Sequence, residues 1–138
     1  MIVGTGVDLA EIGRVARALE STHGSRFASR VFTEGERRYC ESRGRGRVDS
    51  YAARFAAKEA VMKALGVGLG RFPFRDVEVV RARSGAPGLQ LSGKAAALAR
   101  ERGVVEWRIS LTHSELIAAA IVAALGPGPV VAPGTPPP

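Results

Sequence analysis

Asp8 and Glu59 are two carboxylates in positions where acids are unusual. Asp8 ends the first expected strand. Glu59 falls, at 100° per residue, between Phe55 and Met62 on the bulky apolar side of a helix expected from about 50 to 65. A buried carboxylate is costly unless it is paired or bound to metal, and hard cations such as magnesium take carboxylate oxygens as ligands. Both acids are therefore candidate metal ligands.

Each acid also has a purely structural interpretation. Asp8 and Glu11 have capping-box spacing, so Asp8 could cap the helix that follows, and spacing alone favours this interpretation. Glu59 could form an ion pair with Lys63 one turn later, or with Lys58 in the interior. For Glu59 the residues leave both interpretations open.

Lys58 and Lys63 interrupt the same apolar helix. Lysine is seldom fully buried without a partner, so both could extend their ammonium groups to solvent at the helix edge. Alternatively they contact a phosphate, because the turn just downstream, with Gly66, Gly68 and Gly70, would let a phosphorylated cofactor approach the backbone. The turn is not a Walker A loop, since it follows a helix rather than a strand.

His113 is the third unusual residue. Strand alternation places it on the side of Trp107, Ile109 and Leu111 rather than with the polar residues. A hydrogen-bonded core or strand-end histidine is the structural interpretation, and without a second histidine nearby a zinc site is not expected.

Positive charge gathers in the first helix and the segment after it, at Arg14, Arg17, Arg26 and Arg30, in a chain of formal net charge +7. A solvated face or a docking surface for an acidic protein explains these residues equally well. A nucleic-acid-binding module is a second hypothesis, but the arginines form no docking motif. Aromatic residues, 6% of the chain, are also too few for a stacking platform, so no nucleic-acid partner is expected.

Periodicity indicates the elements that must position these side chains. The sequence predicts a strand at 2–8, a helix at 11–20 and a short helix that starts at the Thr33–Glu36 capping box. After a basic loop at 44–49 it predicts a helix at 50–65, a hairpin of strands 76–82 and 88–92, a helix at 94–102 and a strand at 105–111. The run 116–125 is either a strand or a helix. The expected fold class is α+β, a small single domain with a mostly antiparallel sheet packed on helices.

The length of 138 residues points to one domain, expected at 1–125, followed by a Pro- and Gly-rich disordered tail at 126–138. The single cysteine, Cys40, allows neither an intramolecular disulfide nor a cysteine metal cluster. The longest apolar run has ten residues, too short to span a bilayer, and the acids near the start interrupt any signal-peptide pattern. We therefore expect a cytoplasmic protein without a membrane partner.

Four segments, in their order and spacing, resemble the holo-(acyl-carrier-protein) synthases, which are 4′-phosphopantetheinyl transferases. They are IVGTGVDLAEIGR at 2–14, RFAAKEAVMKALG at 54–66, the turn at 68–70 and ISLTHS at 109–114. The resemblance extends to about residue 125. The first two segments are specific in combination, whereas neither is specific alone.

The resemblance implies the 4′-phosphopantetheinyl transferase fold, assembled as a homotrimer that holds coenzyme A at its subunit interfaces. It implies transfer of the phosphopantetheine arm of coenzyme A to a serine of apo-acyl carrier protein, with Mg²⁺ as cofactor and adenosine 3′,5′-bisphosphate as the second product. Such a transfer belongs to fatty acid biosynthesis and lipid metabolism, although the sequence does not choose between fatty-acid and polyketide carriers.

The resemblance also implies roles for single residues. Asp8 and Glu59 would bind magnesium, and Glu59 is our candidate for the group that takes the serine proton. The expected catalytic residues are Asp8, Glu59, Lys63 and His113; the expected coenzyme A-binding residues are Arg54, Lys63, Gly66, Gly68, Thr112 and His113; and the expected carrier-docking residues are Arg14, Arg26 and Phe27. A catalytically idle carrier-binding or trimer scaffold is the third hypothesis, and the intact set of expected catalytic residues argues against it.

Overall fold

Two antiparallel sheets and five α-helices make up the fold in the computed structural model, among residues 1–128 and 134, which the structure describes. In the larger sheet, β5 (Ile117–Leu125) lies between β1 (Ile2–Glu11) and β4 (Glu106–His113). The smaller sheet is the hairpin of β2 (Val77–Arg81) and β3 (Pro87–Leu91). The predicted α+β class with antiparallel pairing is confirmed.

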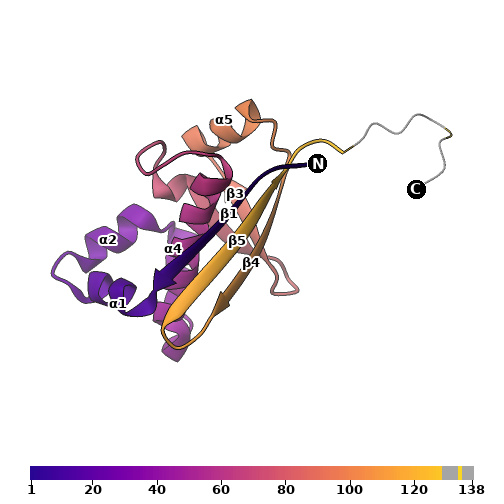
Figure 1. The fold of residues 1–138 in the computed structure, drawn as a ribbon. Coiled ribbons are helices and arrows are strands. Elements are labelled where there is room, and N and C mark those ends of the chain that lie inside the picture. Colours follow the sequence, from indigo (N-terminus) through magenta and orange to yellow (C-terminus); the bar gives the residue numbers. More distant parts are fainter. Residues whose placement is uncertain (129–133, 135–138) are drawn as a thin grey trace.

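The long helix α4 (Arg47–Ala64) runs along one face of the larger sheet and contacts β1, β5 and β4 (Figure 1). The other helices surround it: α1 (Ile12–Glu20), α2 (Gly24–Val31), α3 (Glu34–Glu41) and α5 (Gly93–Glu101), with 3₁₀ turns at Gly44–Gly46 and Phe74–Asp76. In Figure 1, α1 and α2 lie toward one end of α4 and α5 lies toward the other. The helix α4 is thus the element on which the rest of the domain packs.

Glycines in β1 allow α4 to lie directly on the strand. A Cβ atom on Gly6 would stand 1.8 Å from the carbonyl oxygen of Ala60, and one on Gly4 would stand 2.1 Å from that of Ala64. Both distances are far below van der Waals contact, so only glycine fits at these two positions. This close approach brings the first half of β1 against the second half of α4.

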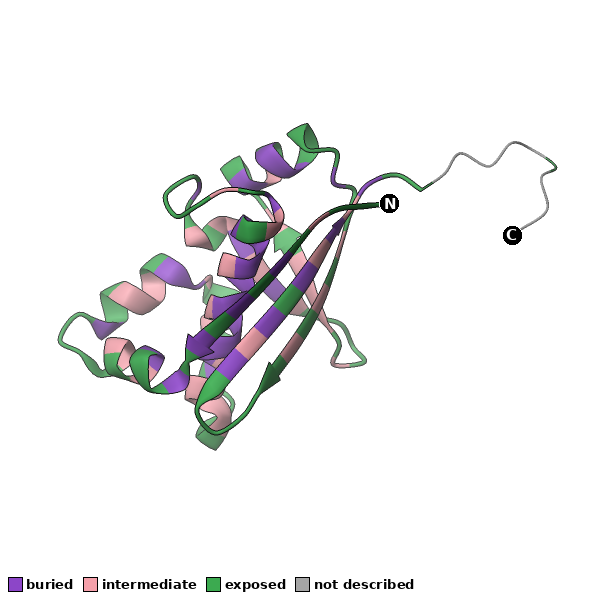
Figure 2. Cartoon of the chain, in the orientation of Figure 1, coloured by how far each residue is buried: buried purple, intermediate pink, exposed green. Residues whose placement is uncertain are grey.

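The larger sheet buries one face and exposes the other, as alternating strands do (Figure 2). Asp8 and Ala120 face α4 and are buried. On the outer face, away from α4, Val7, Leu9 and Ile121 are 57%, 64% and 54% exposed, and Val7 pairs with Ile121. The outer face is therefore an aliphatic surface that a single chain leaves uncovered.

Lys58 is fully buried, with its ammonium group 2.7 Å from Glu36 Oε1. It also donates to the carbonyl oxygens of Phe74 and Val77, while Glu36 Oε2 accepts from the amide of Val79. Burial lowers the pKa of Lys58, and the attraction of Glu36 opposes that effect. Its ammonium group therefore donates to acceptors that link α4 to α3 and to the start of β2. Three expectations for Lys58 are thus wrong: it does not extend to solvent, it is not placed to contact a phosphate, and it does not pair with Glu59.

Replacing Lys58 by methionine should lower the free energy of unfolding by about 3–5 kcal/mol, since it leaves Glu36 as an uncompensated buried charge. The double variant Lys58→Met/Glu36→Gln should recover part of this loss. The exposed pair Arg38–Glu34, 3.6 Å apart, supplies the control, because Arg38→Met should cost less than about 1 kcal/mol. Urea denaturation measures all three, and a Lys58→Met variant as stable as the control would contradict the prediction.

Other expectations had mixed outcomes. The Thr33–Glu36 capping box is confirmed, with both reciprocal hydrogen bonds formed. The run 116–125 forms a strand, and the basic loop is shorter than expected because α4 already begins at Arg47. Asp8 does not cap α1; it lies within β1, and Glu11 occupies the N-cap without a side-chain hydrogen bond.

Most of the predicted tail, at 129–133 and 135–138, lies outside the described residues. Among the residues that are described, no helix is both long and apolar enough to cross a membrane.

Candidate active site

Asp8, Glu59 and Lys63 come together where β1 crosses α4. Asp8 points from the buried face of the strand, and Glu59 and Lys63 lie one turn apart on the helix. The ammonium group of Lys63 is 2.8 Å from Asp8 Oδ1 and 3.1 Å from the carbonyl oxygen of Val7. Lys63 therefore pairs with Asp8 across the two elements, and the expected Glu59–Lys63 helix pair is not the main contact of this lysine.

The nearby Asp8 carboxylate affects the pKa of Glu59. Burial, followed by hydrogen bonding to Asp8 and repulsion from its charge, raises the pKa of Glu59 to about 7, and nearby Lys63 and Arg14 only partly offset this. The hydrogen bond to Asp8 also raises the pKa of Lys63. Without a cation, the cluster therefore holds two acids that resist being ionised together.

This cluster suits a hard divalent cation. Asp8 Oδ2 is buried and has no hydrogen-bond partner among the described residues, although Oδ1 is bound by Lys63. Within the part of the chain that the structure describes, three or more metal-ligating side chains never gather at one point. A cation here would thus have two carboxylates and would complete its shell with water or substrate oxygens, as magnesium commonly does.

A groove of about 440 Å³ leads to Glu59 from the side of α1 and α2. Arg14 and Phe27, two of the expected docking residues, line it together with Phe55 and Leu69. The third, Arg26, is exposed on α2 outside this lining. A mainly apolar, partly aromatic groove, with Arg14 in its lining, thus opens next to the carboxylate cluster.

A second hollow, of about 260 Å³, lies on the other side of Lys63. Lys63, Gly66 and Arg102 line it, and Gly66 adopts a φ of +73°, which favours glycine. Gly68 lines none of these cavities, and a Cβ atom there would meet nothing within 4 Å. The structure therefore associates Gly66, and not Gly68, with the Lys63 cluster.

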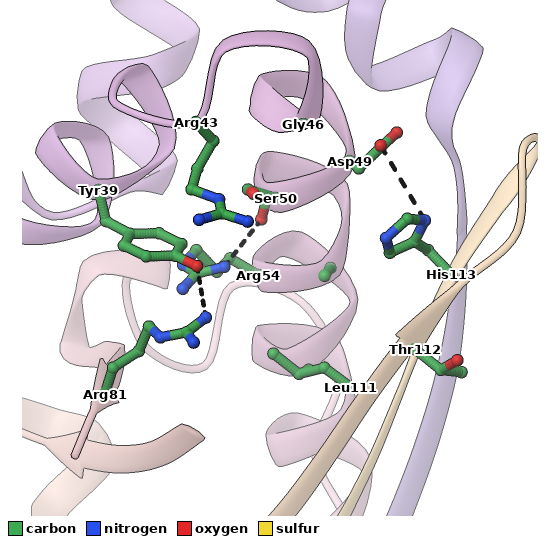
Figure 3. Close-up of a pocket in the computed structure, with 11 residues that line it drawn as sticks. Tyr39, Arg43, Gly46, Asp49, Ser50, Arg54, Arg81, Leu111, Thr112 and His113 are labelled. Carbon is green, nitrogen blue, oxygen red and sulfur yellow. Dashed lines mark hydrogen bonds and ion pairs between the residues drawn. The ribbon is translucent and has the colours of Figure 1, made fainter. Parts of the chain in front are cut away.

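Arg54, Thr112 and His113 lie in a separate cavity of about 190 Å³ between α3, α4 and the end of β4 (Figure 3). His113 Nδ1 is 4.0 Å from Asp49 Oδ2 there. None of Asp8, Glu59 and Lys63 contributes to this lining. In one chain, the expected catalytic and coenzyme A-binding residues are thus divided between two places.

Among the lining residues that sequence reasoning missed are one aromatic ring and two guanidinium groups, those of Tyr39, Arg43 and Arg81. They come from α3, the segment after it and the end of β2, and no sequence motif links them. The accumulation of arginines between 37 and 47 was the only signal in the sequence.

Comparisons with known proteins agree on one family. Residues 4–122 match the model of the 4′-phosphopantetheinyl transferase superfamily. The chain is 48% identical over 116 residues to the holo-[acyl-carrier-protein] synthase of Moorella thermoacetica, covering 84% of this chain and 88% of that protein.

Solved structures show the same similarity. The holo-[acyl-carrier-protein] synthase of Neisseria meningitidis superimposes with a TM-score of 0.81 at 31% identity, covering 91% of this chain and 99% of the other. The synthase of Bacillus anthracis in complex with CoA (3′,5′-ADP) superimposes with a TM-score of 0.75 at 33% identity, covering 92% and 99%. These matches also confirm the predicted fold.

Proposed function

The chain belongs to the 4′-phosphopantetheinyl transferase superfamily, and we propose that it is a holo-[acyl-carrier-protein] synthase. It transfers the 4′-phosphopantetheine group of coenzyme A to a serine of apo-acyl carrier protein and releases adenosine 3′,5′-bisphosphate. The observation that carries the proposal is the Asp8–Glu59–Lys63 cluster. Its Asp8 Oδ2 is buried and has no hydrogen-bond partner among the described residues, a second acid lies nearby, and Lys63 is bonded to Asp8 Oδ1.

Asp8 and Glu59 are the residues that would hold Mg²⁺. A bound ion would supply positive charge to the phosphates of coenzyme A and to the departing bisphosphate. Lys63, fixed by Asp8 and the carbonyl of Val7, adds a second positive charge beside the same phosphates. The two acids, which repel one another in the metal-free protein, would thus form the binding site for Mg²⁺ and, through it, for the phosphates of coenzyme A.

In the proposed reaction, the serine oxygen of the carrier attacks the β-phosphorus of coenzyme A. The bond from that phosphorus to the oxygen bridging it to the adenylate breaks, and the bisphosphate leaves. Glu59 takes the serine proton, because it faces the groove through which a carrier would approach. Arg14 and Phe27 in that groove, with Arg26 on α2, provide a basic and apolar surface for an acidic carrier.

We further propose a cytoplasmic homotrimer whose active sites are shared between neighbouring chains. The aliphatic outer face with Val7, Leu9 and Ile121 supports assembly, because such patches mark interaction surfaces. The division of the expected residues between two cavities supports sharing: one chain would supply Asp8, and its neighbour His113.

Mixing two inactive variants tests the shared site. Asp8→Asn and His113→Ala should each lower transfer strongly, because each removes one half of every site. After co-expression, random assembly should leave about a quarter of the interfaces with both intact halves and restore activity there. If the mixture is no more active than its components, while the two variants are shown to assemble together, each chain has its own complete site.

The proposed reaction itself can be tested by its small product. Chromatography should detect adenosine 3′,5′-bisphosphate released in proportion to holo-carrier, only when apo carrier, coenzyme A and magnesium are all present. Coenzyme A binding without any release would favour the idle scaffold instead.

A further inference from the structure

A hollow of about 380 Å³ opens between the end of α1, α2, α3 and the first turns of α4. Three charged side chains and a hydroxyl line it together with apolar groups. The polar groups belong to Ser25, Arg37, Glu41 and Arg47, and the apolar ones include Leu19 and Ala28. No residue of this lining belongs to the groove at Glu59, the hollow beside Lys63 or the cavity of Figure 3. The proposed reaction therefore leaves this hollow without a role.

Glu41 and Arg47 neutralise one another inside the hollow. Arg47 Nε donates to both carboxylate oxygens of Glu41, at 2.8 and 2.9 Å, and the Tyr51 hydroxyl donates to Glu41 Oε2 at 2.7 Å. The guanidinium of Arg47 also lies over the Tyr51 ring, with its Cζ 5.4 Å from the centroid. The hydrogen bonds from Arg47 and Tyr51 lower the pKa of Glu41, so this acid is ionised and fully engaged at neutral pH.

Arg37 is the charge of this lining that lacks a counter-ion. It precedes Glu41 by one turn of α3, a spacing at which arginine and glutamate commonly pair. Within the described residues, however, Arg37 forms no ion pair. Its Nε is buried and has no hydrogen-bond partner in that part of the chain. A desolvated cationic donor is costly unless an acceptor accompanies it, so the hollow favours an anion.

We propose that this hollow is a binding site for a small aliphatic monocarboxylate. A carboxylate fits the planar fork of a guanidinium with two parallel hydrogen bonds, and its single charge balances the single unpaired charge of Arg37. A phosphate monoester carries nearly two negative charges at neutral pH, more than Arg37 can balance beside the Glu41 carboxylate.

The apolar part of the lining selects the rest of the ligand. Leu19 and Ala28 give a short hydrocarbon chain a surface to cover, and Ser25 adds a hydroxyl for the carboxylate. The volume of about 380 Å³ lies in the lower part of the range of about 300–1,000 Å³ typical of small-molecule sites. An acid of a few carbons therefore fits better than a long-chain one.

Titration of the full chain with butyrate, followed by the NMR shifts of the backbone amides, tests the inference. The largest shifts should occur at Ser25, Ala28 and Tyr51. Acetate should bind more weakly than butyrate, by up to about fourfold for each methylene group that it lacks. Butyramide, which has the same shape without the charge, and methyl phosphate should each bind about tenfold or more weakly than butyrate, because charge-assisted hydrogen bonds are lost or the charges do not match.

Variants of Arg37 separate its charge from its geometry. Arg37→Gln should weaken butyrate binding by about tenfold or more, and Arg37→Lys, which keeps the charge but loses the fork, should lie between this variant and the wild type. Arg38→Gln is the matched control. Arg38 is the next residue of α3, its side chain is 77% exposed and pairs with Glu34, and it lies outside the lining, so this variant should bind butyrate as the wild type does.

Three results would overturn the proposal: largest shifts outside this hollow, butyramide binding as tightly as butyrate, or Arg37→Gln binding butyrate as tightly as Arg38→Gln. A fourth, in which butyrate does not bind but Arg37→Gln weakens binding of apo-acyl carrier protein, would show that the hollow receives a protein side chain instead. The transfer assay keeps this inference apart from the proposed function. Without butyrate, Arg37→Gln should transfer phosphopantetheine at the wild-type rate, and butyrate should bind whether or not transfer occurs.

Discussion

Replacing Glu59 by glutamine is expected to reduce phosphopantetheine transfer by about 10²–10⁴-fold, the usual contribution of a general base. Glutamine keeps the size of the side chain but can neither take the serine proton nor supply a negative ligand to magnesium. The measurement is kcat/KM for apo carrier protein at saturating coenzyme A and magnesium. Glu101→Gln, an exposed change of the same charge on α5, is the matched control. Activity within a few-fold of the wild type would remove Glu59 from the proposed chemistry.

Although Glu59→Gln should lower activity, it should stabilise the metal-free protein at high pH. Because folding raises the pKa of Glu59 to about 7, from 4.5, this carboxyl favours the fold below pH 4.5 and loses that contribution as the pH rises through 7. Glu59→Gln should therefore raise the melting temperature in EDTA at pH 8 relative to the wild type, and should do so less at pH 5. A difference that does not change with pH would show that folding does not raise the pKa of Glu59, through either burial or the neighbouring Asp8.

Gly6→Ala should destabilise the fold by about 3 kcal/mol or more, because overpacking here involves backbone that cannot move aside. The added Cβ would overlap the Ala60 carbonyl oxygen of α4, so β1 and α4 would have to separate. Urea denaturation measures the loss. Gly13→Ala in α1 is the control, since its Cβ would meet only the end of the Arg17 side chain, at 3.3 Å. Equal stability of the two variants would contradict the close approach.

Much of the fold could be predicted because its local signals agree with its tertiary structure. The Thr33–Glu36 capping box and the hairpin of β2 and β3 have local sequence signatures, and both are confirmed. The apolar run that became β5 could not be assigned, because a buried strand and a buried helix look alike in sequence. Burial on one face and pairing on both edges decide in favour of the strand.

The candidate site was harder to predict, since its contacts join distant segments. Lys58 and Lys63 look equivalent in the sequence, yet one is buried against Glu36 and the other reaches Asp8. Which lysine faces which way depends on the placement of α3 and β1, and periodicity does not contain that information. The arginines around Tyr39 lie on three separate segments for the same reason and carry no motif.

The intact mass of an apo-acyl carrier protein, after incubation with this protein, coenzyme A and magnesium, tests the central claim most directly. The account predicts a gain of one phosphopantetheine group, absent with EDTA, absent with Asp8→Asn and absent when the carrier serine is replaced by alanine. No gain with either fatty-acid or polyketide carriers would contradict the claim and would leave a binding protein as the better description.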